Sequence, residues 1–482
     1  MKIKQITTLL LFTFLSLPLA AQVYLDSAEV ARFLPYKNKV VTTTQNALEQ
    51  DSISSDDETD DEVDSTLTAF DYDTHLSWKE NITQRLNNIF QSPLLQTVQA
   101  GVMIWDLTDD TLLFQHNEQL HLRPASTMKC VTAIAALDKL GSSYTYKTSL
   151  YYTGNLVDST QTLEGDLYIV GGMDPMFRAT EMNQLVAAIK NLGINHITGT
   201  LYADLSFKDS KQFGRGWCWD DKNPTLTPLL YNKKDIFIEQ FNQKLRQNGI
   251  TIDSGYGTRQ YPSNAQNIIT TTHSIGDVMH HMMKASDNLY AESMFYQLAS
   301  NGGINKHASA NNARIYIQQL IRKLGLNPSN YKIADGSGLS LYNYLTAELE
   351  VKLLRYAYQN PDIYNTLLPT LPIAGVDGTL RKRMRNTPAA RNVKAKTGTV
   401  VGVTSLAGYL TAANGHLICF SIINNGGLAS GAMRNFQNRI CIALCQSRSI
   451  VNPLAITAFQ HHYSSVDKVS LTNNLHYGAT SE

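Results

Sequence analysis

The chain has 482 residues, 43% of them hydrophobic and 17% charged, and its 41 basic and 41 acidic side chains leave no net charge. This is an ordinary globular composition, long enough for two or three domains with a large core, and it excludes a chain that is disordered throughout. It gives no sign of a nucleic-acid partner. Five irregularly spaced cysteines match neither a disulfide framework nor a zinc site, although one bridge, for example between Cys441 and Cys445, stays open.

The N-terminal stretch "MKIKQITTLLLFTFLSLPLAAQ" has two lysines, a short apolar run and then small residues at Ala20 and Ala21. This order is typical of a cleaved secretory signal, which we place at residues 1–21. No later run reaches the 18 unbroken apolar residues that a membrane span requires. We therefore expect an exported protein of the periplasm or another extracytoplasmic cell-wall space, without a transmembrane segment after cleavage.

The next distinctive segment is "DSISSDDETDDEVD", which holds eight acids and no base. Such a segment buries too little apolar surface to offset the entropy lost on ordering. It predicts a solvated, disordered spacer over residues 22–76.

Ordered structure is expected from Ser77, where a capping box with Glu80 opens a helix. The run "AGVMIWDLTDDTLLFQHN" predicts a β-hairpin, and an apolar helix from Ser126 to about Leu140 predicts burial on all sides. From residue 142 to residue 261 the texture changes to short strands with Gly and Asp turns, which indicates an inserted β-rich domain.

Helical periodicity returns after this insertion, and three strands and a helix follow residue 392. We predict an α/β (α+β) fold whose antiparallel sheet is covered by helices and whose chain is interrupted by the β-rich insertion. The predicted regions are a signal peptide (1–21), an acidic spacer (22–76), the main domain (77–141 and 262–450), the inserted domain (142–261) and a C-terminal tail (451–482).

Ser126 and Lys129 form a Ser-x-x-Lys pair at the start of the apolar helix. The same spacing occurs in "SNYK" and "SVDK", but only at Ser126 does the helix force the lysine toward a core. A lysine with a pKa of about 10.4 is a poor base at pH 7, whereas desolvation or a nearby cation could lower that pKa by several units. Lys129 is therefore either a structural lysine, snorkelling or salt-bridged, or the base that activates the serine.

Two further motifs follow in a fixed order. "KASDNLYAE" places Ser286 and Asn288 at a corner between two helices, where Ser-x-Asn could also be a simple cap. "KAKTGT" places Lys396, Thr397 and Gly398 on a predicted strand whose glycine allows a substrate backbone to approach closely. The ordered triple of Ser-x-x-Lys, Ser-x-Asn and Lys-Thr-Gly is the signature of penicillin-interacting serine enzymes.

The segments "ASTMK", "GDLYIVGGMDP", "KASDNLYAE", "DGSGLS", "VDGTL" and "KAKTGT" together resemble the D-alanyl-D-alanine carboxypeptidase/endopeptidase family, the class C low-molecular-mass penicillin-binding proteins. The resemblance spans about residues 77–447. It implies a transpeptidase-like domain with inserted β-rich material between the first two motifs, acting on peptidoglycan stem peptides and inhibited by β-lactams. This chemistry needs no metal and no organic cofactor.

The resemblance also implies a role for each motif residue. Ser126 would be the nucleophile and Lys129 its first candidate base, while Asn288 would orient Lys129 and the substrate amide. Ser286 would relay a proton to the leaving amine beside Lys396. The remaining roles are an oxyanion hole at the backbone N–H groups of Ser126 and Thr399, and a grip on the substrate carboxylate by Lys396, Thr397 and Thr399 beside Gly398.

Asp174, in "GGMDP", has two interpretations. In relatives an acid of this motif faces the site and reads an amino group of the stem peptide, and a turn aspartate before Pro175 is the simpler alternative.

Two other functions remain open. A serine β-lactamase would share the triple, but the chain has no Glu-x-x-Leu-Asn-like segment after "SDN" and carries a long insertion. A non-catalytic peptidoglycan- or β-lactam-binding protein would keep the pocket without turnover.

Overall fold

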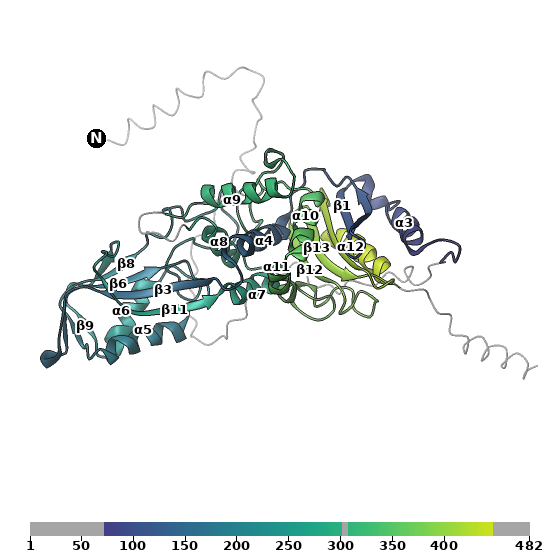
Figure 1. Ribbon diagram of the computed structural model, residues 1–482. Coiled ribbons are helices and arrows are strands. Elements are labelled where there is room, and N and C mark those ends of the chain that lie inside the picture. The colour runs from purple at the N-terminus through teal and green to yellow at the C-terminus, as the bar shows by residue number, and fades with distance from the viewer. Residues whose placement is uncertain (1–71, 301–306, 447–482) are drawn as a thin grey trace, which may run out of the picture. The chain divides into compact units, whose positions relative to one another are not determined.

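The structure is a computed structural model that describes residues 72–300 and 307–446 (Figure 1). Within these two ranges no helix is both long and apolar enough to cross a membrane. The predicted signal peptide, the acidic stretch at residues 51–64 and the C-terminal tail lie outside the described residues.

The first sheet has five strands, each antiparallel to its neighbours, in the order β12-β13-β14-β1-β2. Its strands are β1 (Gln99–Asp106), β2 (Thr111–His116), β12 (Lys394–Val400), β13 (Val403–Thr411) and β14 (Leu417–Asn425). β1 pairs with β14 along its whole length, so the predicted front hairpin joins the predicted C-terminal strands. The expected antiparallel sheet is confirmed, and β12 forms one of its edges.

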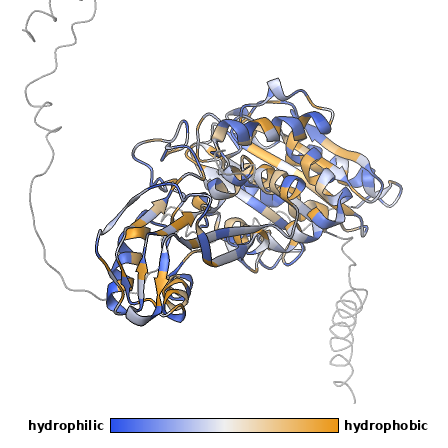
Figure 2. Ribbon diagram, turned by 60° about the vertical axis from the view of Figure 1, so that its left-hand side comes forward, coloured by the Kyte–Doolittle hydropathy of each residue, from blue (hydrophilic) through white to orange (hydrophobic). Residues whose placement is uncertain are grey.

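Helices cover both faces of this sheet. Successive side chains along a strand point to opposite faces, and here the side chains on both faces are apolar. Val102 and Ile104 of β1 pack with α3 (Trp78–Ile89) and α12 (Ser430–Cys445), whereas Met103 belongs to the core on the other face. In the ribbon coloured by hydropathy, hydrophobic segments run along the strands of the sheet and along the helices that cover it (Figure 2). The sheet is therefore the middle layer of three.

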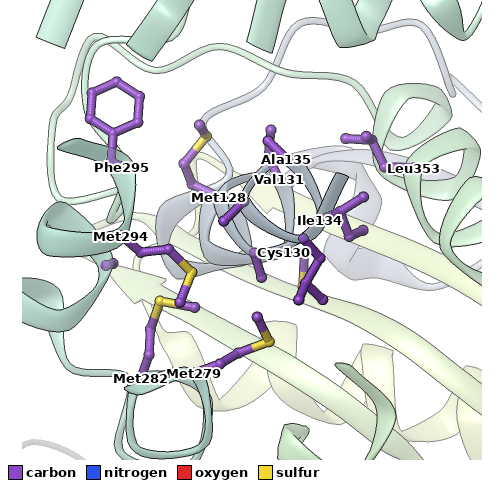
Figure 3. Packing of buried hydrophobic residues seen from close by; sticks show 14 of the residues in the cluster. Met128, Cys130, Val131, Ile134, Ala135, Met279, Met282, Met294, Phe295 and Leu353 are labelled. Carbon is purple, nitrogen blue, oxygen red and sulfur yellow. The ribbon is translucent and has the colours of Figure 1, made fainter. Parts of the chain in front are cut away.

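The helix α4 (Met128–Leu140) is buried on every side from Met128 to Leu137, as its composition predicts. Figure 3 shows its apolar side chains facing methionines of two neighbouring helices, and all of them belong to one buried cluster. Methionine side chains fill irregular gaps of such a core well. The helix begins at Met128 rather than at Ser126. Residues 125–127 instead form a 3-10 turn, in which Ala125 has a φ of 48°.

Five helices of the described ranges, including the two that carry these methionines, contact α4 and fix its position. They are α7 (Ile275–Ala285), α8 (Asn288–Gln297), α9 (Ala310–Lys323), α10 (Ala347–Gln359) and α11 (Pro361–Leu367). Side-chain caps set several helix starts: the predicted capping box of Ser77 and Glu80 opens α3, and Ser309 caps α9.

The inserted region contains two further sheets and two helices. One sheet has the order β10-β8-β6-β3-β11 and the other the order β4-β5-β7-β9. Their elements are β3 (Thr145–Tyr152), β4 (Asn155–Val157), β5 (Thr162–Glu164), β6 (Leu167–Gly171), α5 (Ala179–Asn191), β7 (His196–Ile197), β8 (Leu201–Asp204), α6 (Phe237–Gln247), β9 (Thr251–Ile252), β10 (Tyr256–Thr258) and β11 (Gln266–Ser274).

The strand β11 pairs with β3 almost from end to end, from Gln266 opposite Tyr152 to Ser274 opposite Thr145. Because one strand enters the insertion and the other leaves it, we propose that the inserted region ends at Ser274 rather than at residue 261.

Replacing Ile134 by Ala should lower the free energy of unfolding by about 2–5 kcal/mol, because Ile134 lies fully buried in α4 and the change leaves a cavity. Ile315→Ala on α9 is the matched control: this side chain is 45% exposed, so its loss should cost less than about 1 kcal/mol. Urea unfolding of both variants, followed by circular dichroism, measures the difference. Equal losses would contradict the central position of α4.

Candidate active site

Ser126 lies on the 3-10 turn that leads into α4, and it is half-buried. Two glycines from distant segments pack against this turn. A Cβ atom at Gly338 would stand 1.8 Å from the carbonyl oxygen of Ala125, and one at Gly398 would stand 2.8 Å from both the carbonyl oxygen of Pro124 and the amide nitrogen of Ser126. The sequence therefore needs glycine at both positions to hold Ser126 against the edge strand β12.

Lys129 lies one turn further along, and its side chain is completely buried. Its amine hydrogen-bonds to Ser126 Oγ at 2.9 Å, to Asn288 Oδ1 at 2.8 Å and to the carbonyl oxygen of Ser337 at 2.8 Å. These partners come from the 3-10 turn, from the first residue of α8 and from the loop after α9. Three segments that are distant in sequence thus meet at one nitrogen.

The chemistry of these three partners orients the amine. The amide oxygen of Asn288 and the backbone oxygen of Ser337 can only accept hydrogen bonds, whereas a hydroxyl can donate or accept. When Lys129 is neutral, its two hydrogens are therefore taken by Asn288 and Ser337. The lone pair is left facing the hydroxyl of Ser126, which is the arrangement a general base requires.

Burial lowers the pKa of Lys129 from 10.5 to about 8, while the carboxyl groups of Asp335, Asp287 and Glu292 act in the opposite direction. At pH 7 an amine with this pKa is neutral in roughly one molecule in ten, compared with roughly one in two thousand for an ordinary lysine. The site therefore makes a usable base from a lysine near neutral pH.

Ser286 and Lys396 form the second pair. Ser286 ends α7 in the left-handed conformation, with a φ of 59°, and Asp287 then caps α8. The fully buried amine of Lys396 lies 2.8 Å from Ser286 Oγ and 2.7 Å from the carbonyl oxygen of Thr397. Burial, and then repulsion from Lys129, hold the pKa of Lys396 well below its ordinary value.

We call Ser126, Lys129, Ser286, Asn288 and Lys396 the lysine–serine cluster. The three sequence motifs predicted these five side chains. The structure places them in two hydrogen-bonded groups, one of Ser126, Lys129 and Asn288 and the other of Ser286 and Lys396.

The strand β12 carries the remaining predicted residues. Thr397 is half-buried and shares a hydrogen bond of 2.7 Å with the hydroxyl of Thr379, while Thr399 is exposed. Within the described residues, β13 is the only strand that pairs with this end of β12. Its outer edge is therefore available to an extended peptide, which can pair with it as an additional strand.

Asp174 is not part of the lysine–serine cluster. Its carboxylate is fully buried, accepts the backbone N–H of Met176 at 2.9 Å and pairs with His273 Nδ1 at 2.6 Å. The hydrogen bond to Asp174 raises the pKa of His273. The bond from Met176 is that of a turn aspartate, as in the simpler of the two interpretations. A role for Asp174 in binding a substrate amine stays a prediction.

Two buried acids outside the three motifs, Glu292 and Asp335, support the cluster. Glu292 Oε1 accepts the backbone N–H groups of Gly336 at 3.0 Å and Ser337 at 2.8 Å, which aims the carbonyl of Ser337 at Lys129. Burial, followed by the nearby Asp335, raises the pKa of Glu292 to about 8. Its position four residues after Asn288 on one helix was the signal available in the sequence.

Asp335 holds the loop that contains Ser337. Its two oxygens accept the N–H groups of Gly338 at 2.9 Å and Ser340 at 2.7 Å, and the indole N–H of Trp217 at 2.8 Å. Gly338, with a φ of 84°, is the residue that packs against the turn at Ser126. The "DGSG" segment thus positions both the lysine and the serine.

One group of three described side chains has ligand atoms close enough to hold a metal: Asp106, Asp109 and His416. Asp106 already accepts the N–H groups of Thr108 and Asp109 and pairs with His416 Nδ1 at 2.8 Å. This group ties two adjoining hairpin turns together. All five cysteines lie in the described ranges and are free thiols, so the Cys441–Cys445 bridge is not formed.

Comparison with known proteins identifies the family of this chain. The model of the D-Ala-D-Ala carboxypeptidase 3 (S13) family matches residues 82–230 and 229–446. The D-alanyl-D-alanine carboxypeptidase DacB of Haemophilus influenzae is 26% identical over 428 residues, which cover 70% of this chain and 88% of that protein.

Solved structures show the same fold. Penicillin-binding protein 4 (dacB) of H. influenzae aligns with a TM-score of 0.66 at 24% identity, over 75% of this chain and 98% of that one. Its complex with a β-lactam aligns with a TM-score of 0.60 at 25% identity, over 76% and 98% of the two chains. The fold and the family expected from the motifs are confirmed: the chain belongs to the D-Ala-D-Ala carboxypeptidase 3 (S13) family.

Proposed function

We propose that this chain is a serine-type D-Ala-D-Ala peptidase that cleaves peptidoglycan stem peptides through an acyl-enzyme, as a carboxypeptidase, a DD-endopeptidase or both. The observation that carries this proposal is the buried amine of Lys129, whose contacts with Asn288 and Ser337 leave its lone pair for Ser126. The family and the DacB relative agree with the reaction type.

In the first half of the reaction, Lys129 takes the proton of Ser126 as Oγ attacks the carbonyl carbon before the terminal D-alanine. The negative charge that develops on the substrate oxygen is stabilised by the backbone N–H groups of Ser126 and Thr399. Collapse of this intermediate breaks the peptide bond. Ser286, whose hydroxyl is held by Lys396, gives its proton to the leaving amine and takes up the proton that Lys129 removed from Ser126.

Substrate binding uses the edge of β12. An extended stem peptide pairs with the strand, and its terminal carboxylate lies near Lys396, Thr397 and Thr399. In the second half of the reaction, water attacks the ester at Ser126 and releases the shortened peptide. A DD-endopeptidase would run the same steps on a cross-link between two stem peptides.

β-Lactams are proposed as inhibitors, because their strained amide would acylate Ser126 in the same way. A β-lactam complex of the H. influenzae penicillin-binding protein 4 supports this proposal. The signal-like N-terminus supports export to the periplasm or another extracytoplasmic cell-wall space, where the proposed substrate occurs.

Replacing Ser126 by Ala should lower the release of D-alanine from purified muropeptides at least about a thousandfold and abolish covalent labelling by penicillin, because the nucleophile is removed. Ser329→Ala is the matched control: Ser329 also belongs to a Ser-x-x-Lys sequence, but it is exposed and bonds to Asn327. Mass spectrometry identifies the products. Loss of D-alanine shows carboxypeptidase activity and conversion of dimers to monomers shows endopeptidase activity, and full activity of Ser126→Ala would refute the proposal.

Glu292 is proposed as a positioning residue, and two substitutions separate its role from a loss of folding. Glu292→Ala leaves the N–H groups of Gly336 and Ser337 without their acceptor and should slow acylation by penicillin about ten- to a hundredfold. Glu292→Gln keeps an acceptor oxygen, so its acylation rate should stay within about threefold of that of the wild type, and its KM for the muropeptide should be unchanged. Stopped-flow acylation measures both rates. Equal impairment of the two variants would contradict the proposal that Glu292 acts through its acceptor oxygen.

A further inference from the structure

A loop of the inserted region, residues 212–226, carries exposed aromatic side chains that the proposed reaction does not use. We call it the aromatic loop. Its base is closed by a hydrogen bond from Leu226 N to Gln212 O at 2.9 Å, and its tip by one from Asn223 Nδ2 to Cys218 O at 2.7 Å. These two bonds hold the loop at its base and within its span.

Exposed aromatic rings concentrate at this loop. Trp219 is 93% exposed and Phe213 is 55% exposed, and the half-exposed ring of Tyr342 packs against Gly216. The described ranges contain four exposed aromatic side chains (Phe, Trp or Tyr), and three of the four lie at this loop. An exposed tryptophan leaves a large apolar surface in water, which is typical of a binding site.

The aromatic loop is tied to the active site by direct hydrogen bonds. Trp217 donates its indole N–H to Asp335 Oδ2 at 2.8 Å, and Ser340 donates to the carbonyl oxygen of Arg215 at 2.7 Å. Asp335 in turn accepts from the hydroxyl of Ser337, the residue whose carbonyl receives Lys129. Phe213 and Trp219 thus flank a segment that is anchored to the loop beside the nucleophile.

The composition of the loop indicates an uncharged partner. It contains two acids and two bases, so it has no net charge that would favour an ionic ligand. The face of an aromatic ring carries negative electrostatic potential and attracts the polarised C–H groups on one side of a sugar ring. The sugars of a glycan strand are uncharged rings of this kind, and in peptidoglycan they are covalently joined to the stem peptide.

We propose that the aromatic loop, through Trp219 and Phe213, stacks on the sugar rings that carry the stem peptide while that peptide occupies the active site. This inference rests on the proposed function and adds a second binding surface for the same substrate. The enzyme then recognises the glycan-linked peptide in preference to the free peptide.

The test compares hydrolysis of a free pentapeptide with hydrolysis of the same peptide linked to its disaccharide. Wild-type enzyme should have a kcat/KM about tenfold higher for the disaccharide-linked peptide, through a lower KM. Trp219→Ala should lose this preference while keeping the wild-type kcat/KM for the free peptide. Ile315→Ala, an exposed apolar residue on α9, is the control and should keep the preference.

Direct binding makes the test independent of turnover. The peptide-free disaccharide should cause chemical-shift changes in the indole N–H of Trp219 in wild-type protein, and Trp219→Ala should not bind it. If the enzyme hydrolyses the free peptide but shows no preference for the linked one, the proposed sugar-binding role of the loop is wrong and the proposed peptidase activity stands. Sugar binding without any turnover would refute the peptidase instead. Binding of phospholipid vesicles, lost in Trp219→Ala, without binding of the disaccharide would also overturn the inference.

Discussion

The active site depends on one buried nitrogen, the amine of Lys129. Burying a lysine costs several kcal/mol unless its hydrogens are bonded or its charge is lost, and this amine meets the condition in both of its protonation states. Asn288 and Ser337 accept two hydrogens, and Ser126 either accepts a third or donates its own. The same hydrogen bonds therefore stabilise the buried amine and activate the serine.

The rest of the fold places these partners. The long pairing of β1 with β14 joins the two parts of the main sheet, whose edge strand is β12. Gly398 of this strand fits against the turn at Ser126. The inserted region contacts the elements around the amine: Trp217 donates to Asp335, Lys233 pairs with Asp287 at 3.5 Å, and Ser293 of α8 donates to the carbonyl oxygen of Met173. The insertion thus stabilises the two elements that supply Asn288 and Ser337.

Sequence patterns predicted the parts that are set locally. The burial of α4, the antiparallel strands and the five side chains of the lysine–serine cluster followed from periodicity and from motifs. The contact of Ser337 with Lys129 could not be predicted, because it is made by a backbone carbonyl, and every residue type has one. Asp174 was ambiguous because its partner, His273, lies on a strand far along the chain. The proposed end of the insertion at Ser274 lies beyond the predicted one because β11 is a mostly polar strand whose weak alternation gives little signal in the sequence.

The most direct test of this account is a pH titration of the Lys129 amine itself. The protein is labelled with 13C at the ε carbon of lysine, and the resonance that disappears in Lys129→Arg is followed by NMR. Because burial penalises the ammonium form, the account predicts that this amine loses its proton with a midpoint near pH 8. A midpoint at about 10 or above, as for an exposed lysine, would contradict the claim that the fold makes Lys129 a base near neutral pH.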